Sequence, residues 1–177
     1  MRIIGGELKG REIHAPHLSA RPTTDFAKEG LFNILAHTGV FEEMRVLDLF
    51  GGSGSISFEF ASRGCHSVTC VEMNPVHTSL IKRTAQQFKL DTIRVVRCNV
   101  FDFISVCTQT YDIIFADPPY DLQRLEKLPE KICTARILRP DGVFILEHSA
   151  SFDFSKSQGF RRSVKYGNVH FSFFRNC

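Results

Sequence analysis

A four-residue segment, Asp117-Pro118-Pro119-Tyr120, carries the most specific chemistry in this chain of 177 residues. It directly follows the apolar run 113–116, which reads as a buried strand, and open α/β sheets bind ligands where their strands end. The exocyclic amine of a nucleobase donates two hydrogen bonds, which a carboxylate and a main-chain carbonyl held rigid by two prolines can accept. Such contacts aim the nitrogen lone pair at an electrophile, while Tyr120 offers a ring for stacking. The alternative is a Pro-Pro turn with a capping Asp.

A glycine turn, Gly51-Gly52-Ser53-Gly54, follows the apolar run 46–50 and precedes a predicted helix. Glycines permit positive φ and let the backbone approach a ligand, so a strand, glycine turn and helix are typical of nucleotide-type cofactor sites. Asp48 lies near the end of the first strand. Glu72 ends the next strand, 20 residues beyond Gly52, where a carboxylate can accept both ribose hydroxyls. The sequence therefore predicts a cofactor site formed by Asp48, Gly51, Gly52, Gly54 and Glu72. The alternative is that the glycines form only a tight turn.

The dinucleotide fingerprint Gly-x-Gly-x-x-Gly is incomplete in this turn. Ser57 stands where the last glycine is expected. An NAD-binding oxidoreductase, or a non-catalytic module that holds NAD, therefore remains an alternative that the sequence disfavours.

The elements that must position these residues alternate along the chain from residue 45 onward. The predicted strands are near-continuous apolar runs, as expected when helices cover both faces of a parallel sheet. We predict a doubly wound α/β fold with a mostly parallel central sheet. Its strands are expected at 46–50, 68–71, 93–96, 111–116 and 143–146, its helices at 55–63, 75–88 and 122–137, and a closing antiparallel pair at 160–166 and 169–174.

Residues 2–15 read as a β-hairpin with few apolar positions, so we expect it to contribute little to the core. Thr24 and Asp25 can then cap a helix that ends at Gly39. The apolar face of that helix is predicted to be Phe26, Leu31, Phe32, Ile34 and Leu35.

Charge is concentrated at the two ends of the chain, although the net charge is only +3. Residues 1–40 hold five Lys and Arg against four Asp and Glu, and residues 151–177 hold five against one. A basic N-terminal hairpin suits a polyanion, and we predict contacts from Lys9, Arg11, Arg21 and Thr23. The alternative surface is the tail, where Arg161, Arg162 and Lys165 are interleaved with aromatic residues.

Composition excludes several classes of protein. With 43% hydrophobic and 23% charged residues the chain is typical of a soluble globular domain, and no apolar run reaches the roughly 20 residues of a membrane span. Charged residues stand where a signal peptide would be apolar, so a cytoplasmic protein without membrane contact is expected. The six cysteines show no Cys-x-x-Cys spacing, and we expect reduced thiols and no metal.

Over almost its whole length the chain resembles the RsmD-type 16S ribosomal RNA guanine-N(2) methyltransferases. The N-terminal block is the specific part of the likeness, and the glycine turn and the Asp-Pro-Pro-Tyr segment are shared by many amine methyltransferases. The matching segments are Arg2-Ile-Ile-Gly-Gly-x-x-Lys9-Gly-Arg11, Arg21-Pro-Thr-Thr-Asp25, Leu31-Phe-Asn-Ile-Leu35, Leu47-Asp-Leu-Phe-Gly-Gly-Ser-Gly54, Ser62-Arg-Gly64, Val71-Glu72, Asp117-Pro-Pro-Tyr120 and Lys165-Tyr-Gly167.

This resemblance implies a Rossmann-like class I methyltransferase fold, S-adenosylmethionine as cofactor, and ribosomal RNA, free or in a partly assembled small subunit, as partner. Asp48, Gly52 and Gly54 would line the methionine and ribose of the cofactor, Glu72 would bind the ribose hydroxyls, and residues 117–120 would hold the target guanine. Asn99 and Val100 would contact the adenine. Residues 1–40 would form an RNA-binding extension, and residues 41–177 the methyltransferase domain.

The chain departs from the family pattern at two positions. Gly51 replaces the usual Ala, and Phe26 stands where an Arg is common.

An adenine-N(6) or DNA methyltransferase is the main alternative, because it would use the same four-residue segment. Such enzymes usually carry an added recognition domain, and only 22 residues (121–142) separate Tyr120 from the next predicted strand.

Overall fold

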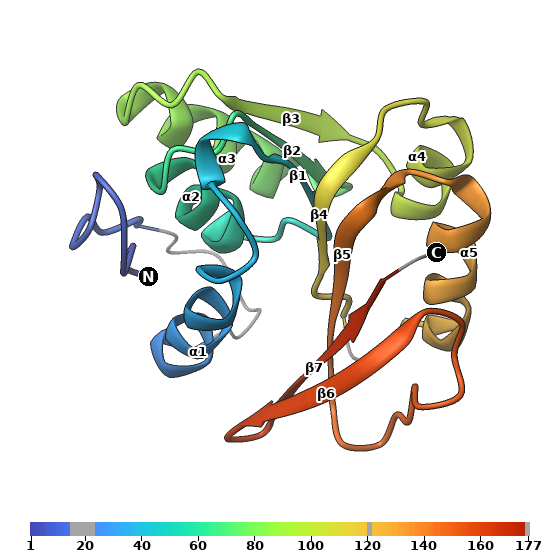
Figure 1. Ribbon diagram of the computed structural model, residues 1–177. Coiled ribbons are helices and arrows are strands. Elements are labelled where there is room, and N and C mark those ends of the chain that lie inside the picture. The colour runs from blue at the N-terminus through green and yellow to red at the C-terminus, as the bar shows by residue number, and fades with distance from the viewer. Residues whose placement is uncertain (15–23, 120–121, 176–177) are drawn as a thin grey trace.

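The structure is a computed structural model that describes residues 1–14, 24–119 and 122–175. In this part of the chain a seven-stranded sheet has the order β3-β2-β1-β4-β5-β7-β6 (Figure 1). The five strands from β3 to β5 are parallel, and β7 and β6 close the sheet as an antiparallel pair, with β7 antiparallel to β5. The strands are β1 Arg45–Leu49, β2 Ser67–Glu72, β3 Ile93–Arg97, β4 Tyr111–Ala116, β5 Leu138–His148, β6 Phe160–Tyr166 and β7 Val169–Phe174.

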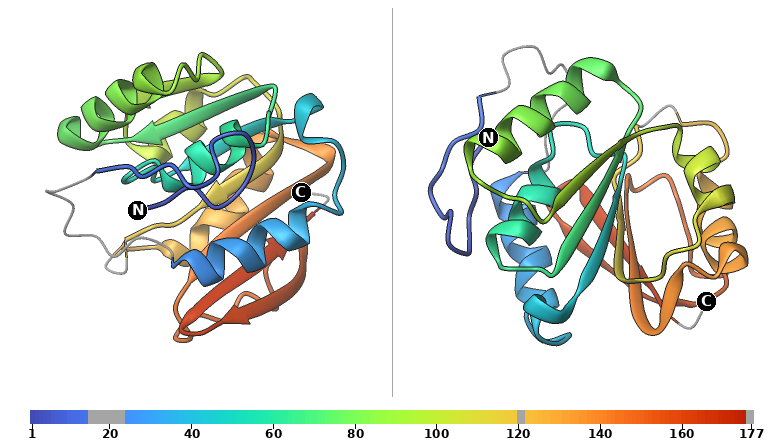
Figure 2. Two further views of the ribbon diagram at one scale, coloured as in Figure 1. Left: turned by 90° about the vertical axis from the view of Figure 1, so that its left-hand side faces the viewer. Right: turned by 90° about the horizontal axis from the view of Figure 1, so that it is seen from above.

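Helices cover both faces of this sheet, which confirms the predicted doubly wound fold (Figures 1 and 2). Alternate strand residues face opposite ways. One set, which includes Val46, Phe115 and Ile145, packs against α1 and α2. The other, which includes Leu47 and Ile114, packs against α4 and α5. The helices are α1 Asp25–Leu35, α2 Ser55–Ser62, α3 Pro75–Gln87, α4 Val100–Val106 and α5 Leu128–Ala135, with 3-10 turns at Phe41–Glu43 and Leu125–Lys127.

Several elements differ from the predicted ones. The sequence does not predict α4, which has only seven residues and begins where the Asn99 side chain accepts a hydrogen bond from the Phe101 amide at 2.9 Å. The helix expected over 122–137 is limited to a 3-10 turn and α5. β5 begins five residues before the expected 143, because Tyr111 already pairs with Leu138 across a register shift.

The N-terminal segment packs against the face of the sheet that α2 and α3 cover, so the expectation that it adds little to the core is wrong. It forms an antiparallel bridge between Arg2 and Glu12. Ile3 and Ile13 are buried in a cluster with Phe58 of α2 and residues of α3. Although only two residues are involved, both isoleucines are buried in the cluster that contains the Phe58 ring. They anchor the N-terminal segment through apolar contacts.

Helix α1 buries a charged residue and exposes an aromatic one, contrary to the predicted apolar face. Phe26 is 66% exposed and makes an edge contact with Tyr166. Lys28 is only 1% exposed, because its ammonium group donates to the Arg2 carbonyl at 2.6 Å and to the buried Glu59 carboxylate at 3.3 Å. Arg63 also pairs with Glu59, so this ionic cluster ties the N-terminal segment to α1 and α2.

Cys65, Cys70, Cys98 and Cys107 are free thiols, as expected. Cys133 is disulfide-bonded, which corrects the expectation of six reduced cysteines. None of the helices in the described residues is long and apolar enough to cross a membrane.

Candidate functional site

Acidic side chains lie together where three neighbouring parallel strands end. The chain leaves β1 toward β2 and β3 on one side and later enters β4 and β5 on the other, so the sheet has its topological switch point between β1 and β4. Ligands bind at such a point, outside the carboxyl ends of the strands. Asp48 lies in β1, Glu72 ends β2, and Asp117 follows β4 with its amide donating to the Leu49 carbonyl at 3.4 Å.

The turn after β1 is held in a conformation that brings backbone amides to this edge. Phe50, Gly52 and Gly54 have φ values of 63°, 53° and 79°. Phe50 is not a glycine, and a positive φ in such a residue is a local strain that the surrounding structure must hold.

Gly51, where the resemblance leads us to expect Ala, directly faces Cys70. A Cβ atom at Gly51 would lie 2.3 Å from the Cys70 Sγ, so an alanine requires the thiol to move. Glycine at this position therefore leaves the space that the Cys70 side chain of β2 occupies.

Glu72 is aligned by the backbone. Its Oε2 accepts from the Gly52 amide at 2.7 Å, which confirms that the glycine turn and the end of β2 lie together. Its Oε1 accepts from the Asn74 amide at 2.7 Å. His77 Nδ1 also lies 3.8 Å from Oε1. A carboxylate has about four acceptor positions, so the two amides leave room for a ligand.

Asp48 is buried and is held by a residue that the sequence analysis regarded only as a missing glycine. The Ser57 hydroxyl, on α2, donates to Asp48 Oδ2 at 2.6 Å. Burial raises the pKa of Asp48 to about 7; the negative charges of Asp117 and Glu72 add to the rise, and the Ser57 hydrogen bond opposes it. A cationic group at this edge would relieve the repulsion among the three carboxylates.

The first residue of α2 leaves a polar atom for a ligand. Ser55 Oγ is buried and has no hydrogen-bond partner among the described residues. A buried hydroxyl without a partner is costly, and a polar ligand bound at the glycine turn would supply one. The donors and acceptors present, namely backbone amides, the Ser55 hydroxyl and the carboxylates of Asp48 and Glu72, fit a cofactor that carries ribose hydroxyls and a positive charge.

Asn99 and Val100 lie at the start of α4, after the end of β3. The Asn99 oxygen is engaged as the helix cap, and Val100 is buried. The Val100 amide is at the first helical position, where backbone donors have no partner within the helix.

Asp117 lies in a small hollow that has room for about one water molecule. The volume of this hollow is about 10 Å³. Burial raises the pKa of Asp117 to about 7, and no side chain or amide of the described residues donates a hydrogen bond to its carboxylate. Tyr120 lies outside the described residues. The hollow is lined by Asp117, Pro118, Pro119, Leu125, Glu147, His148, Ser149, Phe152 and Val169.

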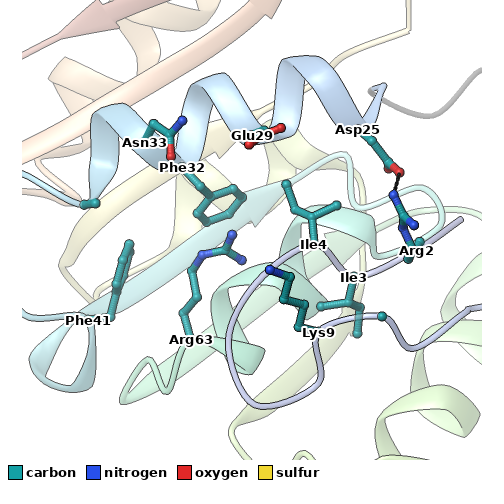
Figure 3. Close-up of a pocket in the computed structure, with 12 residues that line it drawn as sticks. Arg2, Ile3, Ile4, Lys9, Asp25, Glu29, Phe32, Asn33, Phe41 and Arg63 are labelled. Carbon is teal, nitrogen blue, oxygen red and sulfur yellow. Dashed lines mark hydrogen bonds and ion pairs between the residues drawn. The ribbon is translucent and has the colours of Figure 1, made fainter.

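A larger pocket, of about 450 Å³, lies between the N-terminal segment, α1 and the end of α2 (Figure 3). Lys9 of the N-terminal segment and Arg63, the residue that follows α2, both line the pocket. The Arg63 guanidinium lies 3.9 Å from the centre of the Phe32 ring, and Arg2 pairs with Asp25 at 3.2 Å.

Of the other residues predicted to contact a polyanion, Arg11 is exposed, and Arg21 and Thr23 lie outside the described residues. Among the side chains that the structure describes, no group of three His, Cys, Asp or Glu residues is arranged to hold a metal ion.

The topology and the residues at its switch point define a class I methyltransferase fold. A solved structure with this architecture, a candidate methyltransferase of Escherichia coli named yhhF, superimposes with a TM-score of 0.85 and 28% identity over 99% of this chain and 97% of that one.

The family model described as Conserved hypothetical protein 95 matches residues 1–175, and the chain belongs to this family, the RsmD family. It is 39% identical over 129 residues to the ribosomal RNA small subunit methyltransferase D of Escherichia coli K12. That match covers 72% of this chain and 64% of the relative's length. A relative of the same name from Buchnera aphidicola (subsp. Baizongia pistaciae) is 25% identical over 99% of this chain and 92% of its own length. The family membership that the sequence resemblance indicates is confirmed.

Proposed function

We propose that this protein transfers a methyl group from S-adenosylmethionine to the N(2) amine of a guanine in small-subunit ribosomal RNA. The observation that carries the proposal is the convergence of Asp48, Glu72 and Asp117 at one edge of the sheet, between a glycine turn on β1 and a Pro-Pro segment after β4. The names of the relatives support ribosomal RNA of the small subunit as substrate.

The residues of the β1 and β2 side would hold the cofactor. In the proposal, Glu72 accepts the ribose hydroxyls, Gly51, Gly52 and Gly54 line the methionine side, and Asp48 faces the positive charge. Asn99 and Val100, at the start of α4, contact the adenine. When bound, the cofactor supplies a methyl group already activated on a sulfonium, with a neutral leaving group.

The residues after β4 would hold the base. The Asp117 carboxylate accepts one hydrogen of the guanine amine, and Pro118 and Pro119 fix the main-chain carbonyl that accepts the other. The nitrogen lone pair is thereby left free to attack, so orientation is the main contribution of the protein. With a pKa of about 7, Asp117 can also take up the proton that the amine releases after transfer. Tyr120 is assigned to stacking on the base.

Residues 1–40 are assigned to RNA binding although α1 and the N-terminal segment share the core. Lys9 and Arg11 are exposed cations on that segment, and Arg2, Lys9 and Arg63 line the neighbouring pocket (Figure 3). Positive charge of this kind suits the phosphate groups of RNA. Arg21 and Thr23, in the segment that leads to α1, complete the proposed RNA surface.

Two measurements test the proposal. Calorimetry with S-adenosylhomocysteine and with NAD, side by side, should show binding of the first only. Incubation with a radiolabelled methyl donor should then label small-subunit ribosomal RNA taken from cells that lack the enzyme, and leave large-subunit RNA and DNA unlabelled. Binding of NAD, or label in DNA, would contradict the proposal.

A further inference from the structure

Glu147 occupies the same position on β5 that Asp117 occupies after β4. The two strands are parallel neighbours whose register ends with Phe115 opposite Ile145 and Ala116 opposite Leu146, so the next two positions are Asp117 and Glu147. Directly adjacent residues on neighbouring strands lie on the same face. The Glu147 position is therefore the immediate neighbour of the Asp117 position in the sheet.

The face on which Glu147 lies is the one that carries the other site acids. Phe171 on β7 pairs with Glu147 on β5. Both Phe171 and Ile145 belong to the cluster under α1 and α2. Asp48 faces the same way, since Ser57 of α2 donates to it. The carboxyl edge thus presents a row of acids on neighbouring strands, in the order Glu72, Asp48, Asp117 and Glu147.

Glu147 is buried, with 7% of its surface exposed, and it lines the hollow that contains Asp117, Pro118 and Pro119. Its neighbour His148 also lines the hollow, but both ring nitrogens of His148 are engaged: Nδ1 with the Ser149 carbonyl at 2.8 Å and Nε2 with the Ser172 hydroxyl at 2.7 Å. Glu147 is the residue that brings a carboxylate into this hollow from β5. A carboxylate has about four acceptor positions, so a contact within the protein leaves room for a ligand.

We propose that Glu147 determines base specificity by accepting the N1–H of the target guanine while Asp117 accepts its N(2) amine. The inference rests on the proposed function and goes beyond it to the residue that selects the base. On the Watson–Crick edge of guanine two adjacent donors, N1–H and the amine, would face two adjacent carboxylates. Adenine has an acceptor at N1, which would meet a carboxylate with no hydrogen between them.

The test uses two RNAs that differ only at the guanine methylated by the wild-type protein. In the second RNA this base is 2-aminopurine, which keeps the amine but has an acceptor at N1. The wild-type kcat/KM for guanine should exceed that for 2-aminopurine by about 100-fold or more. In Glu147→Gln the side-chain NH2 can donate to an N1 acceptor and its carbonyl can still accept N1–H, so this ratio should fall by at least about 10-fold, mainly through faster 2-aminopurine transfer.

Glu130→Gln is the matched control, because Glu130 is exposed on α5 and should leave the ratio unchanged. Thermal unfolding and S-adenosylhomocysteine binding show whether Glu147→Gln still folds. If it does not, Glu147→Asp, which keeps the charge and shortens the side chain, should slow guanine transfer and retain selectivity. An unchanged ratio in a folded Glu147→Gln protein would overturn this inference alone, whereas a wild-type protein without methyl transfer to RNA would overturn the proposed function.

Discussion

The two halves of the site hold their carboxylates in different ways. On the β1 and β2 side, Glu72 accepts two backbone hydrogen bonds and Asp48 accepts one from Ser57. On the β4 side, Asp117 receives no hydrogen bond from the described residues, and burial raises its pKa. The carboxylates of the first half are held by hydrogen bonds within the protein, whereas the Asp117 carboxylate can accept hydrogen bonds from the donors of a ligand. We infer that the cofactor half is preformed and that selectivity for the base arises in the other half.

Removal of Asp117 should separate the two halves most strongly. Because its oxygens are assigned to the base amine, Asp117→Ala should lower methyl transfer by about 100-fold or more. Cofactor affinity should stay within a few-fold of the wild-type value, as measured by calorimetry with S-adenosylhomocysteine. Asp91→Ala, at an exposed position, is the control. Near-normal turnover in Asp117→Ala would remove it from the base half.

Removal of Glu72 should have the opposite signature. Glu72→Ala removes the carboxylate that orders the Gly52 amide and is assigned to the ribose, so cofactor binding should weaken by roughly 1.5–3 kcal/mol, about 10- to 150-fold. At saturating cofactor, transfer should recover substantially. An unchanged titration curve would mean that the ribose is held elsewhere.

The pH dependence of stability should reveal the charge of the buried Asp48. Its pKa is about 7 in the folded protein, above the ordinary 3.8, so between these values the folded state retains a proton that the unfolded state has released. Stability from this group therefore decreases as pH rises from about 4 to 7, by at most about 1.4 kcal/mol per pH unit. Thermal unfolding of the wild type and of Asp48→Asn across this range should show a smaller decrease in the variant, where Asp117, whose pKa burial also raises to about 7, still contributes. Parallel curves would place the titration on another group.

The smallest expected effect lies outside both halves. Neutralising Lys9 and Arg11 together should weaken RNA binding and reduce its salt dependence. The slope of log affinity against log salt concentration should fall by up to about 0.7–0.9 for each phosphate group that the protein no longer neutralises. Cofactor affinity should not change. If the salt slope stays the same, the RNA surface lies elsewhere, and the basic tail with Arg161, Arg162 and Lys165 becomes the next surface to test.

Much of the sheet can be predicted because its strands are marked by composition. The predicted bounds of β4 and of the β6–β7 pair agree with the structure to the residue, since an apolar run and a Gly167-Asn168 turn set their limits. The buried charges of α1 and α2 could not be predicted. Lys28 and Glu59 look like solvent-exposed residues in the sequence, and only the fold places each beside the other.

The cofactor half of the candidate site can be predicted, because the 20-residue spacing between Gly52 and Glu72 is typical of such sites. The hydrogen bond between Gly52 and Glu72 agrees with the predicted arrangement of the glycine turn and the second strand. Ser55, the hydrogen bond of Ser57 and the position of Glu147 were not predicted from the sequence. Glu147 carries a signal, because it follows the apolar run 143–146 in the same way that Asp117 follows 113–116. The serine contacts depend on the packing of α2 over β1, which has no local signature.

The measurement that tests the division of the site most directly is nucleoside analysis of RNA methylated by the wild-type protein. Small-subunit ribosomal RNA from cells that lack the enzyme would be incubated with a radiolabelled methyl donor, digested, and separated against standards. We expect the label in N(2)-methylguanosine. Label in N(6)-methyladenosine, or in no nucleoside of an RNA that binds the protein, would contradict the assignment of Asp117 and its neighbours to the guanine amine.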